Sequence, residues 1–231
     1  MTSSEVLRQP DLRLISQEQL VAEVKSIYAG LNIVESKCIE IDKSEALALQ
    51  ERRSHYPLPT ESWQALSSLH RTLLHEHHDF FLASQHTSVS PALRRLAAKY
   101  SMPARMWKHG IHAFLEILQH RLPASLDYML AYIYLAYRMM TPLFETVPSF
   151  EEPWIECLGD IGRYRAAIED GNRPDWDTWA DVARSWYNGV DGKSPRDDQL
   201  YHHLATLSRS AHTGLFANGV NMSLCSTVLH S

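Results

Sequence analysis

The spacing of the apolar residues is the feature that most restricts the fold of this chain. Between residues 17 and 49 they recur every three or four positions, for example at Leu20, Val24, Ile27 and Leu31. This period buries one face of an α-helix, whereas the alternating period of a half-buried strand occurs nowhere in the sequence. The chain has 9 glycines against 10 tyrosines and 6 tryptophans, which suits packed helices better than a turn-rich β protein. The sequence therefore predicts an all-α fold.

Prolines and capping residues mark where the predicted helices begin and end. Ser90-Pro91 places a capping hydroxyl before a proline at the first helical position, Pro103 opens another helix in the same way, and Thr60 is expected to cap a helix. Pro142 is expected to kink or end the most apolar helix. The predicted helices cover residues 17–49, 60–81, 91–100, 103–121, 124–147, 150–170, 176–189 and 199–210.

The domain organisation follows from these helices. We predict a flexible N-terminus over residues 1–16, one helical region over 17–170, tetratricopeptide-like helices over 174–210 and a loose tail over 211–231.

The tetratricopeptide prediction comes from a repeat register. Such a unit has 34 residues, with small residues where two helices cross and a proline at its exit. If Pro195 is that proline, Ala183 and Tyr187 occupy the small and aromatic positions of the second helix, and Tyr201 and Leu204 begin the next unit. A generic helical hairpin with the same spacing is the alternative.

Composition restricts the compartment and the class of protein. A net charge of −5 argues against a general nucleic-acid coat protein. Cys38, Cys157 and Cys225 are odd in number and far apart, which favours a reducing compartment without a disulfide framework or zinc ribbon. The N-terminus has no apolar signal segment, and the longest strongly apolar run, Tyr128 to Tyr137, covers half a membrane span. We expect a soluble protein of the nucleus or cytoplasm.

Histidines at residues 75–78 invite a metal interpretation, which the spacing does not support. A zinc-protease helix needs His-Glu-x-x-His, and the fifth position of the motif, with His75 as the first, is Asp79. A third ligand is not identifiable elsewhere, so we expect no metal and no cofactor. His75 or His78 is instead expected to hydrogen-bond inside the bundle. Nucleophile elbows and glycine-rich phosphate loops are also missing, which favours a protein that is not an enzyme.

Positive charge gathers in one part of the chain. Residues 91–121 carry six basic residues and one acid, whereas residues 145–181 carry ten acids and three arginines. Arg94, Arg95 and Lys99 are candidates for contact with a nucleic-acid backbone. Solvated helix faces of ordinary kind are the alternative.

Arg163 and Tyr164 form the core of the strongest candidate binding site. They end a segment, Gly159-Asp160-Ile161-Gly162-Arg163-Tyr164, whose two glycines cost about 1 kcal/mol each inside a helix, so close packing or a ligand should compensate. The planar guanidinium and the hydroxyl suit a phosphate or carboxylate. An ion pair between Arg163 and a neighbouring acid, Asp160 or Glu156, is the alternative.

A second set of basic residues could complete such a site. Arg105, Lys108 and His112 step by three and four positions, so an α-helix would place them on one face. If that face lies opposite Arg163, the donors converge on one anion.

Four segments resemble the N-terminal domain of the Est/Smg family, which includes telomerase-accessory Est proteins and nonsense-mediated-decay Smg adaptors. They include Gly-Asp-x-x-Arg-Tyr and a later Tyr-x-x-Leu-Ala, and lie at residues 69–74, 105–109, 157–165 and 200–205. The resemblance covers residues 17–210. It implies a 14-3-3-like helical fold joined to tetratricopeptide-type helices, a phosphoserine-binding groove, and the start of a DNA/RNA-binding region near Leu200.

The resemblance assigns roles residue by residue. Arg163 and Tyr164 match the phosphate-contacting pair of the family. The groove lysine of the family follows the helix tryptophan by five residues, and counting from Trp107 that position is His112. A neutral imidazole supplies less charge than lysine near pH 7, and Lys108, one turn earlier, is the candidate substitute. The sequence thus predicts an adaptor that binds phosphorylated protein segments, with a DNA/RNA-binding accessory protein as the alternative.

Overall fold

The computed structural model describes residues 16–50, 58–168 and 173–188. Every element in these ranges is a helix and none is a strand, which confirms the all-α prediction. The elements are α1 (Gln17–Gln50), α2 (Thr60–Ser84), α3 (Pro91–Arg94), α4 (Leu96–Lys99), α5 (Met102–Arg105), the π-helix η1 (Met106–His112), α6 (Ala113–His120), α7 (Leu126–Thr146), the 3-10 turn η2 (Pro148–Phe150), α8 (Glu151–Ile168) and α9 (Arg173–Asn188).

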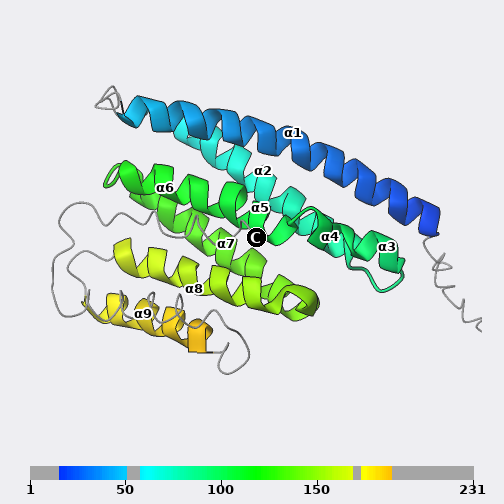
Figure 1. Ribbon diagram of the computed structural model, residues 1–231. Coiled ribbons are helices and arrows are strands. Elements are labelled where there is room, and N and C mark those ends of the chain that lie inside the picture. Colours follow the sequence, from blue (N-terminus) through cyan, green and yellow to red (C-terminus); the bar gives the residue numbers. More distant parts are fainter. Residues whose placement is uncertain (1–15, 51–57, 169–172, 189–231) are drawn as a thin grey trace, which may run out of the picture.

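The long helices follow one another across the molecule, from α1 on one side to α9 on the other (Figure 1). The main pairs are α1 with α2, α7 with α8 and α8 with α9. The apolar stripe of α2 fills the centre, where Leu73, Leu74, Phe80 and Phe81 are fully buried. Because these residues recur at helical spacing, they all point to one face of α2. No described helix combines the length and the hydropathy that crossing a membrane requires.

Local signals place most helix boundaries well, and two details differ from the prediction. Ser90 caps α3, and its hydroxyl accepts a hydrogen bond from the Leu93 N–H at 3.4 Å, with Pro91 in the first turn. Thr60 is already the first residue of α2, so the prediction that it caps this helix was wrong. Pro142 lies on an exposed position inside α7, which continues to Thr146, so proline does not end this helix.

The turn Met106–His112 differs from the sequence prediction because it is a π-helix and not an α-helix. Its backbone hydrogen bonds reach one residue further than those of an α-helix, which widens the turn. Residues spaced by three and four therefore do not keep to one face across this segment. This segment carries Trp107, Lys108, His109 and His112, which include two candidate site residues.

The two glycines of α8 are explained by close packing against α9. A Cβ added at Gly159 would lie 2.3 Å from the Tyr187 ring, and one at Gly162 would lie 3.2 Å from Ala183. Ala183 and Tyr187 are buried at this crossing. Of the two explanations offered for the glycines, close packing or a ligand, the structure shows close packing. The repeat register itself stays a prediction, because its proline at residue 195 lies outside the described residues.

Some predictions lie outside the described residues. They are the flexible N-terminus up to residue 15, the proline at residue 195, the helix at 199–210 with Tyr201 and Leu204, the tail at 211–231 and Cys225.

Candidate functional site

Three of the predicted site residues meet where η1 and α6 face α8. His112, the last residue of η1, lies against Tyr164 of α8, with ring centroids 6.2 Å apart and planes at 77°. The charge of Arg163, also on α8, acts on the same imidazole. We call His112, Arg163 and Tyr164 the polar cluster. Segments far apart in the sequence thus place a guanidinium, a hydroxyl and an imidazole together.

Asp160 holds Arg163 in place. One Asp160 carboxylate oxygen, Oδ1, lies 3.0 Å from Arg163 Nε and 2.8 Å from Nη2, and it also accepts a hydrogen bond from the Tyr187 hydroxyl at 2.7 Å. Asp160 is 2% exposed. The ion pair that the sequence left open as an alternative is therefore present. Through Tyr187 it links the orientation of Arg163 to the packing of α9.

Glu116 of α6 is the second acid beside the polar cluster. It accepts a hydrogen bond from the Tyr164 hydroxyl at 2.7 Å, and its Oε1 lies 4.0 Å from His112 Nε2. Burial and the adjacent Glu116 charge raise the pKa of Tyr164, so the phenol keeps its proton and acts as a donor. Sequence reasoning did not assign Glu116 to the site, although it lies one helical turn after His112.

His112 is uncharged at neutral pH. Burial lowers the pKa of His112 and outweighs the neighbouring charges, of which Glu116 and Asp160 favour the protonated ring and Arg163 opposes it. Around the imidazole there are thus one guanidinium and two carboxylates.

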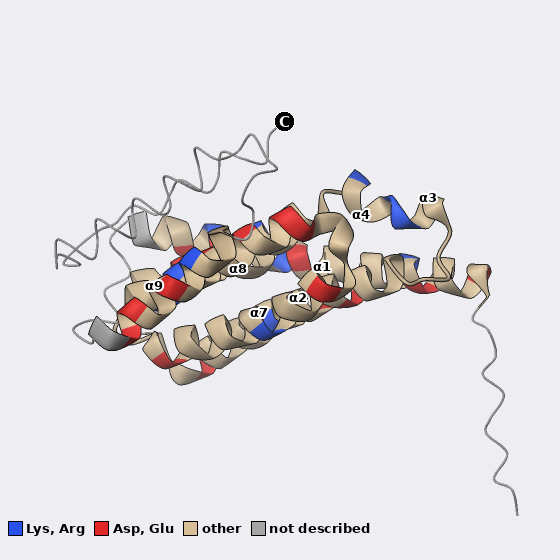
Figure 2. Cartoon of the chain, turned by 90° about the horizontal axis from the view of Figure 1, so that it is seen from below, with Lys and Arg blue, Asp and Glu red and all other residues tan. Residues whose placement is uncertain are grey.

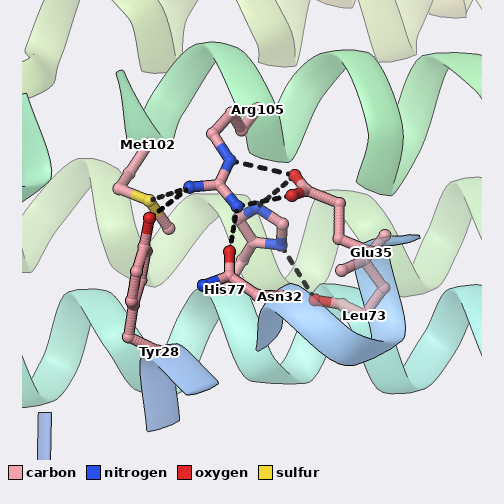
Figure 3. A network of polar contacts seen from close by, with 7 residues as sticks. All are labelled: Tyr28, Asn32, Glu35, Leu73, His77, Met102 and Arg105. Carbon is pink, nitrogen blue, oxygen red and sulfur yellow. Dashed lines mark hydrogen bonds and ion pairs between the residues drawn. The ribbon is translucent and has the colours of Figure 1, made fainter. Parts of the chain in front are cut away.

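Arg105 does not join the polar cluster, which corrects the sequence prediction. It points to α1, where Nε donates to Glu35 at 3.0 Å and Nη2 donates to Asn32 at 2.8 Å and to the second Glu35 oxygen (Figure 3). Its guanidinium also lies over the Tyr28 ring at 5.5 Å. The prediction assumed α-helical spacing to His112, and the π-helix removes that spacing.

The fully buried histidine of the 75–79 segment is His77, and not His75 or His78 as the sequence predicted; His78 is partly buried and lies 3.6 Å from Asp79. His77 is fully buried and its Nδ1 donates to the Leu73 carbonyl at 3.0 Å, while Nε2 faces Glu35 at 4.0 Å (Figure 3). Burial lowers the pKa of His77 to about 4. His75 is exposed. Within residues 16–50, 58–168 and 173–188, no group of three or more ligands could hold a metal ion.

Glu35 belongs to a row of polar contacts that fastens α1. Asp42 lies 3.3 Å from His70 of α2, and Glu45 pairs with Arg121, which follows α6. Sequence reasoning did not assign these three acids a role. The signal was present, because Leu31, Glu35, Cys38, Asp42 and Glu45 follow the same three-and-four spacing as the apolar stripe.

The basic residues of α3 and α4 form a separate surface. Arg94, Arg95 and Lys99 are exposed, and Figure 2 shows blue on these helices without red. Arg94 is partly fixed, because its Nη2 donates to the carbonyls of His86 and Thr87 at 3.3 and 3.4 Å. Lys108 is exposed on η1.

Comparison of the chain with protein-family models, curated proteins and solved structures gave no match. The Est/Smg resemblance therefore remains a prediction from the matched motifs. The geometry of the polar cluster is the stronger basis for a functional hypothesis, because it depends only on residues whose positions are described.

Proposed function

We propose that this protein is a non-catalytic helical adaptor that binds a phosphorylated segment of a partner protein at the polar cluster. The observation that carries the proposal is the meeting of Arg163, Tyr164 and His112 from α8 and η1. A phosphoserine brings a charge of about −1.5 to −2 and three acceptor oxygens. A guanidinium fork and an imidazole N–H are suitable donors for such a group, whereas the Tyr164 hydroxyl already donates its one proton to Glu116.

The ion pair with Asp160 is compatible with this role because it orients Arg163. A long side chain that is already restrained loses less conformational freedom when it binds a ligand. Tyr187 restrains Asp160 in turn, at 2.7 Å. A phosphate then competes with a carboxylate of lower charge for a guanidinium that is already in position.

The Est/Smg resemblance extends the proposal to a pathway. An adaptor of this type would act in nonsense-mediated mRNA decay or in telomerase regulation. The sequence motifs supply no catalytic constellation, so we assign the polar cluster to binding alone.

The proposal is tested by capturing partners on the full chain from lysate before and after phosphatase treatment. Phosphatase should abolish capture of the specific partner, and equal capture of both forms would reject the proposal. In a second step, Arg163→Lys keeps a cation for Asp160 but removes the fork. We expect this variant to bind a phosphopeptide identified by the capture at least about tenfold more weakly, because one charge-assisted hydrogen bond is lost.

Arg184→Lys is the matched control for Arg163→Lys. Arg184 pairs with Asp181 at the same three-residue spacing, but both side chains are exposed on α9. This variant should bind like the parent. Circular dichroism on both variants confirms that the fold is unchanged.

The exposed basic surface of α3 and α4 supports a second candidate function, an accessory protein that binds DNA or RNA. Residues 91–99 carry Arg94, Arg95 and Lys99 and no acid. Affinity for single-stranded RNA should then fall with salt at a logarithmic slope of about 0.7 for each phosphate neutralised. Lys99→Gln should reduce that slope, and a flat salt response would exclude this function.

A further inference from the structure

The polar cluster and the two acids beside it together carry more negative than positive charge at neutral pH, which an anion-binding site must overcome. Arg163 contributes one positive charge, Asp160 and Glu116 contribute two negative charges, and His112 is uncharged. A dianion entering this arrangement would meet net repulsion. Protonation of a group close to the anion would relieve this repulsion.

His112 is the group placed to take up that proton. Its Nε2 already lies 4.0 Å from Glu116, and its ring lies against Tyr164. The added positive charge would stand beside both the incoming anion and the two carboxylates.

The other titratable groups on neighbouring elements act elsewhere. Glu35 and Arg105 pair with each other at the α1 interface, and the charges of Glu35 and Asp42 act on His109 and not on His112. His77 of α2 faces Glu35 at 4.0 Å. On η1, α6 and α8, the groups that act on His112 are Glu116, Asp160 and Arg163.

We propose that the polar cluster takes up its anion together with a proton on His112, so that occupancy rises as the pH falls below neutral. This inference rests on the proposed function, because it describes how that same site is regulated. Phosphorylated partners would bind most tightly under mildly acidic conditions, and a lysine at position 112 would remove this dependence.

The test uses sulfate at constant ionic strength, because sulfate is a tetrahedral dianion that does not titrate between pH 5 and pH 8. Binding to the full chain is followed through the His112 imidazole signals in nuclear magnetic resonance spectra. We expect the affinity for sulfate to rise by up to about tenfold for each pH unit as His112 takes up one proton. Sulfate should in turn shift the titration of His112 to higher pH.

Two variants isolate the proton. Glu116→Gln keeps the size of the side chain, removes one competing charge and should bind sulfate several-fold more tightly at pH 7.5, as read from backbone amide signals around Arg163. His112→Lys should bind sulfate at pH 7.5 without pH dependence, and His112→Gln serves as a second pH-independent variant if the lysine impairs folding.

The outcomes separate this inference from the proposed function. Sulfate binding by the parent that stays constant with pH, or a pH dependence that persists in His112→Gln, would overturn the proton-linked mechanism and leave the anion site standing. An absence of sulfate binding at every pH, in the parent and in folded His112→Lys alike, would overturn the anion site itself.

Discussion

Replacing Gly159 with alanine should destabilise the protein, although alanine is the better helix former. The added Cβ would lie 2.3 Å from the Tyr187 ring, about 1 Å closer than an ordinary contact. The ring cannot easily move away, because its hydroxyl is held at 2.7 Å by buried Asp160. Overpacking costs about 1–3 kcal/mol and a strained hydrogen bond to a charged group at least about 1.5 kcal/mol, while helix propensity returns about 1 kcal/mol.

The net loss in the free energy of unfolding should be about 1.5–3.5 kcal/mol, which corresponds to a fall in Tm of roughly 3–14 °C for a chain of this length. Urea unfolding followed by circular dichroism measures it. Gly30→Ala on α1 is the matched control, because its Cβ would meet only the flexible Glu76 side chain at 3.4 Å. That variant should be neutral or gain up to about 1 kcal/mol.

A second substitution tests whether the contact between residue 159 and the Tyr187 ring causes the loss of stability. Tyr187→Leu is itself destabilising, but Gly159→Ala should cost much less in its presence because the ring is gone. If Gly159→Ala unfolds at the parent's urea midpoint, or if its cost is the same with and without Tyr187, the close contact between α8 and α9 does not set the stability of this region.

Three further predictions concern buried polar groups. Arg105→Met and Glu35→Leu should each lower the free energy of unfolding by about 2–3 kcal/mol, which is low for a buried pair because 21% of the Arg105 side chain is exposed. The double variant should recover most of that lost stability in urea unfolding. Additive losses would show that the pair is not coupled. The unfolded state takes up a proton on His77 near pH 6.5 and the folded state only near pH 4, because burial lowers the pKa of the folded state. The contribution of His77 to the free energy of unfolding should therefore be fully present above pH 6.5 and fall by up to about 3 kcal/mol toward pH 4. Urea unfolding of the parent and of His77→Leu checks this, and equal pH slopes would contradict it. Burial, with Asp42 and Glu35 nearby, raises the pKa of the Cys38 thiol to about 12. Native Cys38 should therefore resist iodoacetamide at pH 8 and react only after unfolding, as peptide mass spectrometry would show. Rapid labelling of the native protein would refute the burial of Cys38.

Features that depend on neighbouring residues were predictable from the sequence. The apolar spacing of α1 and the Ser90-Pro91 start of α3 depend on interactions within one or two helical turns, and both predictions hold. The two glycines in α8 indicated either close packing or a ligand, and the structure shows close packing against α9. Interactions within one or two helical turns therefore account for the fold class and for most helix boundaries.

Features that depend on distant partners were not predictable. Arg105 was expected beside His112, but its partner Glu35 lies 70 residues away, and no local pattern names that partner. The π-helix was also missed: η1 packs against α1 and α2, and no local residue pattern distinguished it from an α-helix. His77 was buried in place of its neighbours for the same reason.

The acids on α1 have a consequence for how this long helix is assembled. An apolar stripe alone would allow α1 to slide along α2 by one turn, about 5.4 Å, and still bury leucines. Glu35 and Glu45 each pair with one particular arginine, Arg105 and Arg121, so a slipped helix would leave these carboxylates without their partners, a change that costs several kcal/mol. The polar contacts therefore define the longitudinal register of α1 and allow one alignment of its whole length.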